Sequence, residues 1–268
     1  MELLLWIIGF SLLGGLLSVA IASSFLLLSD NARNRTVPHL VSFAVGALLG
    51  ASFLGLIPHA LEHEVSVDAH DVGLTLLLGL LLFFVLEKMV LWRHCHHDHC
   101  DGHLPDLDGS AHNHHQEAKN KAAGTLILVG DTIHNFVDGI LITAAFMTDI
   151  HLGIVTALAI AAHEIPQELG DFAILLQSGF KRSKALYYNV LSSLGTVAGA
   201  LLAYFTLADM QHLLPYILVV AASSFIYVAV ADLIPGLHNR VELSATLQQI
   251  ALIAAGTICI FVTHNTLH

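Results

Sequence analysis

Residues 122–178 read AAGTLILVGDTIHNFVDGILITAAFMTDIHLGIVTALAIAAHEIPQELGDFAILLQS, and this stretch decides the fold. It contains two apolar runs, 122–147 and 151–178, each long enough to cross the roughly 30 Å hydrocarbon core of a bilayer as a helix. Both runs carry acidic residues near the centre, and these are Asp131, Asp138, Glu164, Glu168 and Asp171. Five acids facing lipid would cost roughly 12–17 kcal/mol on insertion scales, so we expect them to face the interior of a helical bundle.

The remainder of the chain is similarly apolar. Of its 268 residues 56% are hydrophobic and only 12% are charged, whereas soluble domains carry about 25% charged residues. Eight apolar runs can be marked, at residues 3–28, 40–61, 72–92, 122–147, 151–178, 186–208, 212–234 and 247–265. The first run is too long for a secretory signal and no basic residue precedes it, so we interpret it as a retained membrane helix. The sequence therefore predicts an all-α integral membrane protein with eight transmembrane helices, forming a single domain over residues 1–268.

The basic residues predict the orientation, because Lys and Arg concentrate in cytoplasmic loops. With eight helices every Lys and Arg falls on one side, and these residues are Arg33, Arg35, Lys88, Arg93, Lys119, Lys121, Lys181, Arg182, Lys184 and Arg240. The loops on the other side carry acids and no basic residue. We therefore predict a multi-pass protein of the cell membrane with both termini outside.

The segment 93–121 is the one long polar stretch, and the predicted orientation places it in the cytoplasm. It is rich in histidine and also holds Cys95 and Cys100. The segment is too polar to build a core, and no regular spacing arranges its histidines into one closed site. We expect a cytoplasmic histidine-rich loop that buffers or senses metal, with an inert linker as the alternative.

The polar residues of the two central runs recur at helical spacing. Residues four apart share a helix face, and such pairs are His134 with Asp138, His163 with Gln167, and Glu164 with Glu168. Two antiparallel neighbouring helices would bring both motifs to the same depth. Imidazole with carboxylate suits zinc, iron, manganese and cadmium better than calcium or magnesium. The spacing therefore predicts a transition-metal site at the midplane.

Other residues allow two interpretations each. His59, after Pro58, is either an interfacial residue or a metal ligand at an entrance, and Asn189 is either a neutral oxygen ligand or a packing contact. The glycine pairs Gly46–Gly50 and Gly195–Gly199 have the spacing that permits close helix contact.

The two motifs His134-Asn135-Phe136-Val137-Asp138-Gly139 and His163-Glu164-Ile165-Pro166-Gln167-Glu168-Leu169-Gly170-Asp171 carry a family resemblance. The chain resembles the ZIP (Zrt/Irt-like) family of divalent metal transporters, in its histidine-rich HEXPHEXGD-type subfamily. The resemblance implies a 3+2+3 bundle, in which the first and last three helices are inverted repeats around the metal-binding helices four and five. It further implies transport of Zn²⁺ into the cytoplasm, with Fe²⁺, Mn²⁺ and Cd²⁺ as other substrates.

The resemblance also implies site residues and partners. One metal position would be lined by His134, Asp138, His163 and Gln167, and a neighbouring position by Asn135, Asp138, Glu164 and Gln167. Residue 167 departs from the subfamily, which usually has histidine there. The expected partners are divalent metal ions, the lipid bilayer and a second copy in a homodimer, with no nucleic acid.

Two other functions remain as alternatives. His163-Glu164-Ile165-Pro166-Gln167 is one residue from the HExxH signature of zinc proteases, although Gln167 replaces the second ligand. Asp131, His134 and Asp138 resemble the site of cation-diffusion exporters, which have six membrane helices and a soluble domain. We therefore predict a transporter and no enzyme, with intramembrane protease and metal exporter as the alternatives.

Overall fold

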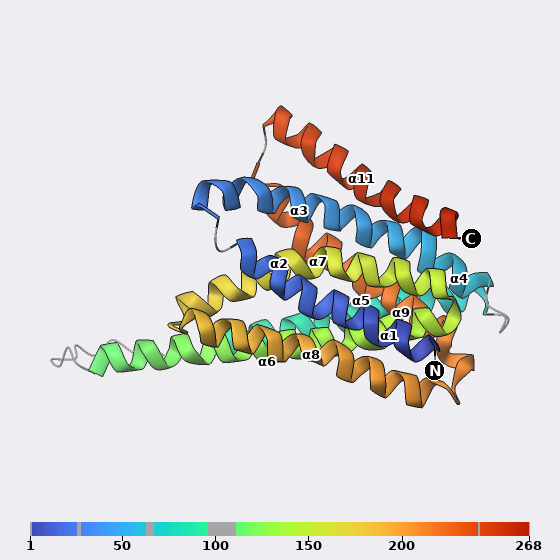
Figure 1. Cartoon of the computed structure of the whole chain (residues 1–268), viewed down its shortest axis with the longest axis horizontal. Helices are drawn as coiled ribbons and strands as arrows, with labels where there is room; N and C mark the ends of the chain where they lie inside the picture. Colours follow the sequence, from blue (N-terminus) through green and yellow to red (C-terminus); the bar gives the residue numbers. More distant parts are fainter. Residues whose placement is uncertain (1, 26–27, 63–66, 96–110, 241, 268) are drawn as a thin grey trace.

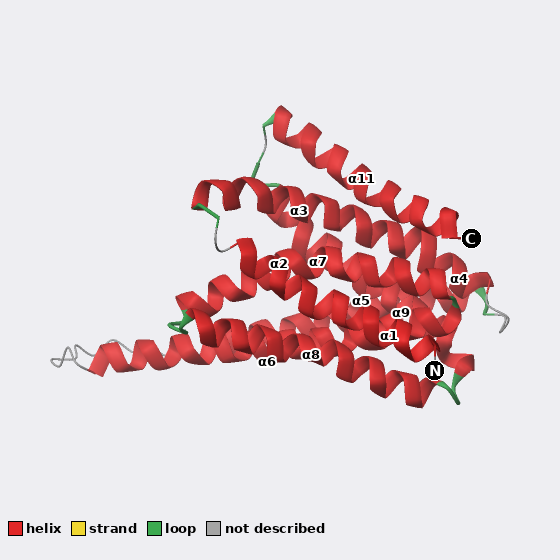
Figure 2. Cartoon of the chain, viewed as in Figure 1, coloured by secondary structure: helices red, strands yellow, loops and turns green. Residues whose placement is uncertain are grey.

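The computed structural model describes residues 2–25, 28–62, 67–95, 111–240 and 242–267. These residues form helices and short connections, with no strand among them (Figure 2). The long helices run back and forth along one axis as a bundle (Figure 1). The structure thus confirms the all-α prediction for the described residues.

The helices follow the apolar runs predicted from the sequence. The first run comprises α1 (Glu2–Leu12), the π-helical segment η1 (Leu13–Leu17) and α2 (Ser18–Phe25). The second comprises α3 (Asp30–Gly50), the π-helical segment η2 (Ala51–Leu56) and α4 (Ile57–Glu62). The third to sixth are α5 (Ala69–Cys95), α6 (Ala111–Thr148), α7 (Ile150–Gln177) and α8 (Arg182–Leu207). The seventh comprises η3 (Gln211–Leu213), α9 (Leu214–Tyr227), the π-helical segment η4 (Val228–Leu233) and α10 (Ile234–Leu237), and the last is α11 (Leu243–Leu267).

Seven of these stretches are long and apolar enough, by length and composition, to cross a membrane. The eighth crossing helix is α7, which has 28 residues but carries Glu164, Glu168 and Asp171. It packs against α2, α3 and α6, and these neighbouring helices cover Glu164 and Glu168, whereas Asp171 is half-buried. Both chain termini lie at the same end of the bundle (Figure 1), as an even number of crossings requires.

The boundary of the polar segment 93–121 differs from the prediction. Helix α5 continues to Cys95, and α6 begins at Ala111 rather than at residue 122. Hydropathy missed this extension because residues 116–121, QEAKNK, are polar yet mostly good helix formers. The part of the predicted histidine-rich loop at residues 96–110 lies outside the described residues.

Glycines bring two pairs of helices into backbone contact. A Cβ added at Gly199 of α8 would lie 1.9 Å from the carbonyl oxygen of Phe136 in α6, and one at Gly139 would lie 1.9 Å from that of Thr196. In the pair α3 and α11, a Cβ at Gly46 would lie 2.0 Å from the carbonyl oxygen of Ile253. The close contact predicted from the glycine spacing is therefore present in both helix pairs.

The second and seventh crossings share an interruption of the helix. In each, a π-helical segment is followed directly by Ile-Pro, at Pro58 after η2 and at Pro235 after η4. A leucine precedes both, so Leu-Ile-Pro occurs near the C-terminal end of both crossings. The matching interruption supports the inverted-repeat arrangement, in which these two crossings correspond. Such π-helical turns often lie at functional sites.

Candidate metal centre

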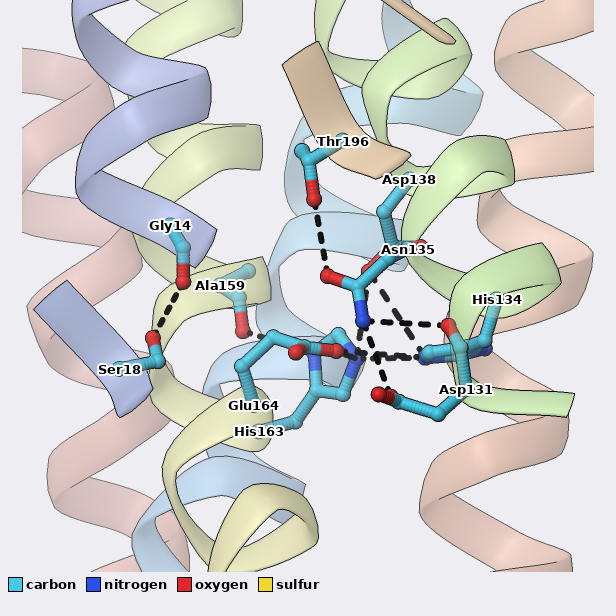
Figure 3. Close-up of polar contacts among 10 residues, drawn as sticks. All are labelled: Gly14, Ser18, Asp131, His134, Asn135, Asp138, Ala159, His163, Glu164 and Thr196. Atoms are coloured by element: carbon cyan, nitrogen blue, oxygen red, sulfur yellow. Dashed lines mark hydrogen bonds and ion pairs between the residues drawn. The ribbon is translucent and has the colours of Figure 1, made fainter. Parts of the chain in front are cut away.

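Four side chains from α6 and α7 converge inside the bundle. His134 and Asp138 are one turn apart on α6, and His163 and Glu164 are adjacent on α7 (Figure 3). Each offers one possible ligand atom, and these four atoms lie within 4.8 Å of one another. His163, Glu164 and Asp138 are each 1% exposed. The predicted convergence of both motifs at one depth is therefore present.

The distances between the ligand atoms suit a tetrahedral ion. The Nε2 atoms of His134 and His163 are 3.3 Å apart. Oε1 of Glu164 lies 3.5 Å from both of these nitrogens. Oδ2 of Asp138 lies 3.5 Å from Nε2 of His163 and 3.8 Å from Nε2 of His134. Ligands at 2.0–2.1 Å from a tetrahedral zinc ion are about 3.4 Å apart. The four residues therefore fit a zinc-sized ion with little movement.

A backbone contact fixes the protonation of the His163 ring. Its Nδ1 lies 3.3 Å from the carbonyl oxygen of Ala159, one turn earlier on α7. A carbonyl can only accept, so Nδ1 carries the hydrogen and Nε2 presents its lone pair to the centre. Contacts of this kind orient a metal-binding imidazole before the ion arrives.

A second group of ligands overlaps the first. Asp131 of α6 and Glu168 of α7 join Glu164 in a cluster of carboxylates whose possible ligand atoms also lie within 4.8 Å of one another. Glu164 therefore belongs to both groups. The first group is a mixed nitrogen and oxygen set, whereas the second is all oxygen and binds transition metals less selectively.

Most oxygens of the buried carboxylates have no hydrogen-bond donor among the described residues. Both oxygens of Asp138, Glu164 and Glu168 are buried without a hydrogen-bond partner, and so is Oδ2 of Asp131. Buried charges without partners are strongly unfavourable unless they bind a cation or a proton. A divalent cation at this centre would offset two of the negative charges.

Asn135 binds a neighbouring acid. Its Nδ2 donates to Oδ1 of Asp131 at 2.9 Å, and its Oδ1 accepts from the hydroxyl of Thr196 on α8 at 2.8 Å (Figure 3). This contact turns the amide oxygen, which the resemblance implied as a metal ligand, toward α8. Asn135 here orients Asp131. The role of Thr196 was not predicted, since a threonine in an apolar run gives no signal of its own.

The other predicted residues lie around the centre or apart from it. Gln167 is half-buried one turn after His163, and half-buried Asp171 lies outside both ligand groups. Asn189 is 1% exposed, and its Nδ2 donates to the backbone oxygen of Glu168 at 3.4 Å. This contact places it beside the all-oxygen group. His59 lies on α4, away from both groups.

Comparison with known proteins agrees with these motifs. The family model described as ZIP Zinc transporter matches residues 2–264. Relatives include zinc transporter ZIP13 of Gallus gallus, 31% identical over 89% of this chain and 77% of its own length. Zinc transporter zipt-7.1 of Caenorhabditis briggsae is 30% identical over 95% of this chain and 76% of its own. Zinc transporter SLC39A7 of Homo sapiens is 29% identical over 88% and 66%. With the family model matching nearly the whole chain, and with two converging histidine and acid motifs at its centre, the protein belongs to the ZIP zinc transporter family.

Proposed function

We infer that this chain carries divalent transition-metal ions, zinc foremost, across the cell membrane into the cytoplasm through the centre between α6 and α7. The observation that carries the proposal is the convergence of two imidazoles and two carboxylates, at the spacing of a zinc ion, inside a bundle of apolar helices. The relatives named above are zinc transporters, which favours transport over the protease interpretation.

The overlap of the two ligand groups supports passage of the ion rather than permanent storage. An ion held by His134, Asp138, His163 and Glu164 can reach the carboxylate group while it keeps Glu164 as a ligand. Each step then exchanges some ligands and retains one, so the ion is never without protein ligands. A continuous change of ligands keeps the barrier between the two positions low.

Several finer features belong to the same proposal. Fe²⁺, Mn²⁺ and Cd²⁺ accept the same imidazole and carboxylate ligands, so we include them as substrates. The bias of Lys and Arg to one side supports an orientation with both termini outside. The family resemblance supports a homodimer in the bilayer, with the histidine-rich segment 93–121 in the cytoplasm.

Zinc-65 flux into proteoliposomes tests the function and its direction. Protein inserted in one orientation, as established by an epitope tag at the C-terminus, should carry zinc from the side of the termini to the other side. The imposed pH and voltage are varied separately to identify any coupling. Flux that occurs only in the opposite direction would favour the exporter, and absence of flux in inserted protein would reject transport.

Zinc should protect the folded protein from thermal unfolding, whereas calcium and magnesium should not. A ligand that binds only the native state stabilises it by about 2.7 kcal/mol at 100 times its dissociation constant. Nitrogen ligands account for the expected preference. The midpoint of unfolding in detergent is measured with each chloride salt. Equal protection by magnesium at the same concentration would contradict a centre that uses His134 and His163.

The variant Gln167→His should bind zinc more tightly at the centre. An imidazole is a better zinc ligand than an amide, and residue 167 lies one turn after His163 on α7. We expect affinity to rise about tenfold, which is ~1.4 kcal/mol, and turnover to fall because release slows. Calorimetric zinc titration measures the affinity. The matched control is Gln177→His, which adds the same ring at an exposed position near the end of α7. Equal changes in both variants would show that residue 167 does not coordinate.

A further inference from the structure

A second pair of histidine rings lies at the end of the bundle that carries both chain termini. His59 is on α4 and His264 is in the last turn of α11. These segments are far apart in sequence, but Figure 1 shows the C-terminal end of α11 beside α4. The two ring centroids are 5.2 Å apart, and both residues are half-buried. The fold therefore builds this pair from two separate helices.

The separation of the rings suits two ligands of one ion. Two imidazoles bound to a tetrahedral zinc ion at 2.0–2.1 Å have ring centres about 5 Å apart. In the metal centre, the rings of His134 and His163 are 5.5 Å apart. The pair of His59 and His264 thus has nearly the same spacing as the pair that supplies both nitrogens of the centre.

The ring of His59 is also oriented in the same way as that of His163. Nδ1 of His59 lies 3.0 Å from the carbonyl oxygen of Gly55, one turn earlier. In the same way, Nδ1 of His163 lies 3.3 Å from the carbonyl oxygen of Ala159. The carbonyl can only accept, so Nδ1 of His59 carries the hydrogen and Nε2 has the lone pair that binds metals. The protein thus sets the metal-binding tautomer of His59 in advance.

The pair is separate from the centre, and the turn before His59 packs against α7. A Cβ at Gly55 would lie 3.3 Å from Leu152 and 3.9 Å from Val155, both on α7. Val155 is eight residues before His163, a rise of roughly 12 Å along the helix. His59 lies one further turn along its own helix from Gly55. The pair is therefore several turns from the centre, toward the end of the bundle where the termini lie.

We propose that His59 and His264 form a loading site, which captures a divalent transition-metal ion at the end of the bundle before the ion reaches the centre. The role in loading rests on the proposed inward transport. A site with two imidazoles binds zinc more weakly than the four ligands of the centre. Weak binding is expected at a loading site, because the ion must leave it to reach the centre.

Flux measurements on His59→Ala and His264→Ala test the loading role. Each variant should raise the zinc concentration for half-maximal uptake about tenfold, and the effect should fall on this concentration rather than on the maximal rate. The double variant should have about the same half-saturating zinc concentration as either single variant. This follows because one remaining imidazole already holds the ion poorly. The control is His70→Ala, which removes an exposed histidine of α5 that contacts Asp68. An unchanged half-saturating concentration, or complete loss of flux in inserted protein, would overturn the proposal.

Chemical labelling tests the site itself, independently of transport. Diethyl pyrocarbonate modifies imidazole nitrogens, and a bound ion blocks that reaction. Mass spectrometry of peptides should show zinc slowing modification of His59 and His264 with one common midpoint, while His70 reacts unchanged. In His59→Ala, the protection of His264 should disappear. Protection that persists there, or no protection in the unmodified sequence, would overturn the site. If the protein carries no zinc but the two histidines are protected together, the site stands and the transport function fails.

Discussion

Substitution of His163 by alanine is expected to reduce zinc flux at least about 100-fold, to the background of empty vesicles. The change removes one of the two nitrogen ligands of the centre, and its ring is the one whose tautomer is fixed by Ala159. Mutation of residues that merely orient a ligand typically costs 10–100-fold in affinity or activity, so loss of the ligand itself costs at least as much. The remaining carboxylates can take up protons or water, so the protein should still fold and insert.

Zinc-65 uptake at several zinc concentrations measures this effect. The matched control is His212→Ala, which removes an exposed histidine on η3. Size-exclusion profiles in detergent establish that both variants are folded. Uptake by folded His163→Ala at the rate of the unmodified protein would show that the centre is not on the ion path.

Substitution of Gly199 by valine is expected to have the largest effect on stability. The first added carbon would lie 1.9 Å from the carbonyl oxygen of Phe136, so α8 must move away from α6. Overpacking typically costs 1–3 kcal/mol, and a clash with backbone belongs at the upper end, so we expect a loss of about 3 kcal/mol. Separation of these helices would also lengthen the contact of Thr196 with Asn135, which orients Asp131.

Unfolding in detergent, followed by circular dichroism, measures the loss. Gly73→Ala is the control, because this glycine is also inside a helix but an added Cβ meets nothing within 4 Å. Alanine is favoured over glycine in helices by up to about 1 kcal/mol, so the control should be neutral or stabilising. Equal behaviour of the two variants would mean that α6 and α8 are not in backbone contact in the membrane.

The crossings and the convergence of the two polar motifs were predictable because each has a strong local signal, although the resemblance implied Gln167 in the ligand set where the structure groups Glu164. Apolar length identifies a helix in lipid whatever its neighbours are. His134 with Asp138 and His163 with Glu164 are polar residues where lipid would exclude them, so their convergence follows from energetics and helical period. The glycine contacts were likewise predicted, since Gly195 and Gly199 are four residues apart.

The contacts that depend on distant partners were not predictable in this way. Thr196 binds Asn135 only because glycines set the distance between α6 and α8, and threonine itself is ordinary in a membrane helix. His264 appears isolated near the end of the sequence, and only the packing of α11 against α3 brings it to His59. Hydropathy also does not report π-helical segments such as η2, because one wider turn leaves the composition unchanged.

The backbone contact between α6 and α8 limits which parts of the protein can move during a transport cycle. If α8 slid along α6, residues with side chains would take the places of Gly139 and Gly199. Their Cβ atoms would then clash with the backbone carbonyl oxygens that these glycines now face. We therefore expect these helices to move together, with His134 and Asp138 on the α6 side of the pair. His163 and Glu164 belong to a different helix, α7. A rearrangement that opens the centre first to one side of the membrane and then to the other is therefore expected to keep α6 and α8 together and to occur between other helices of the bundle.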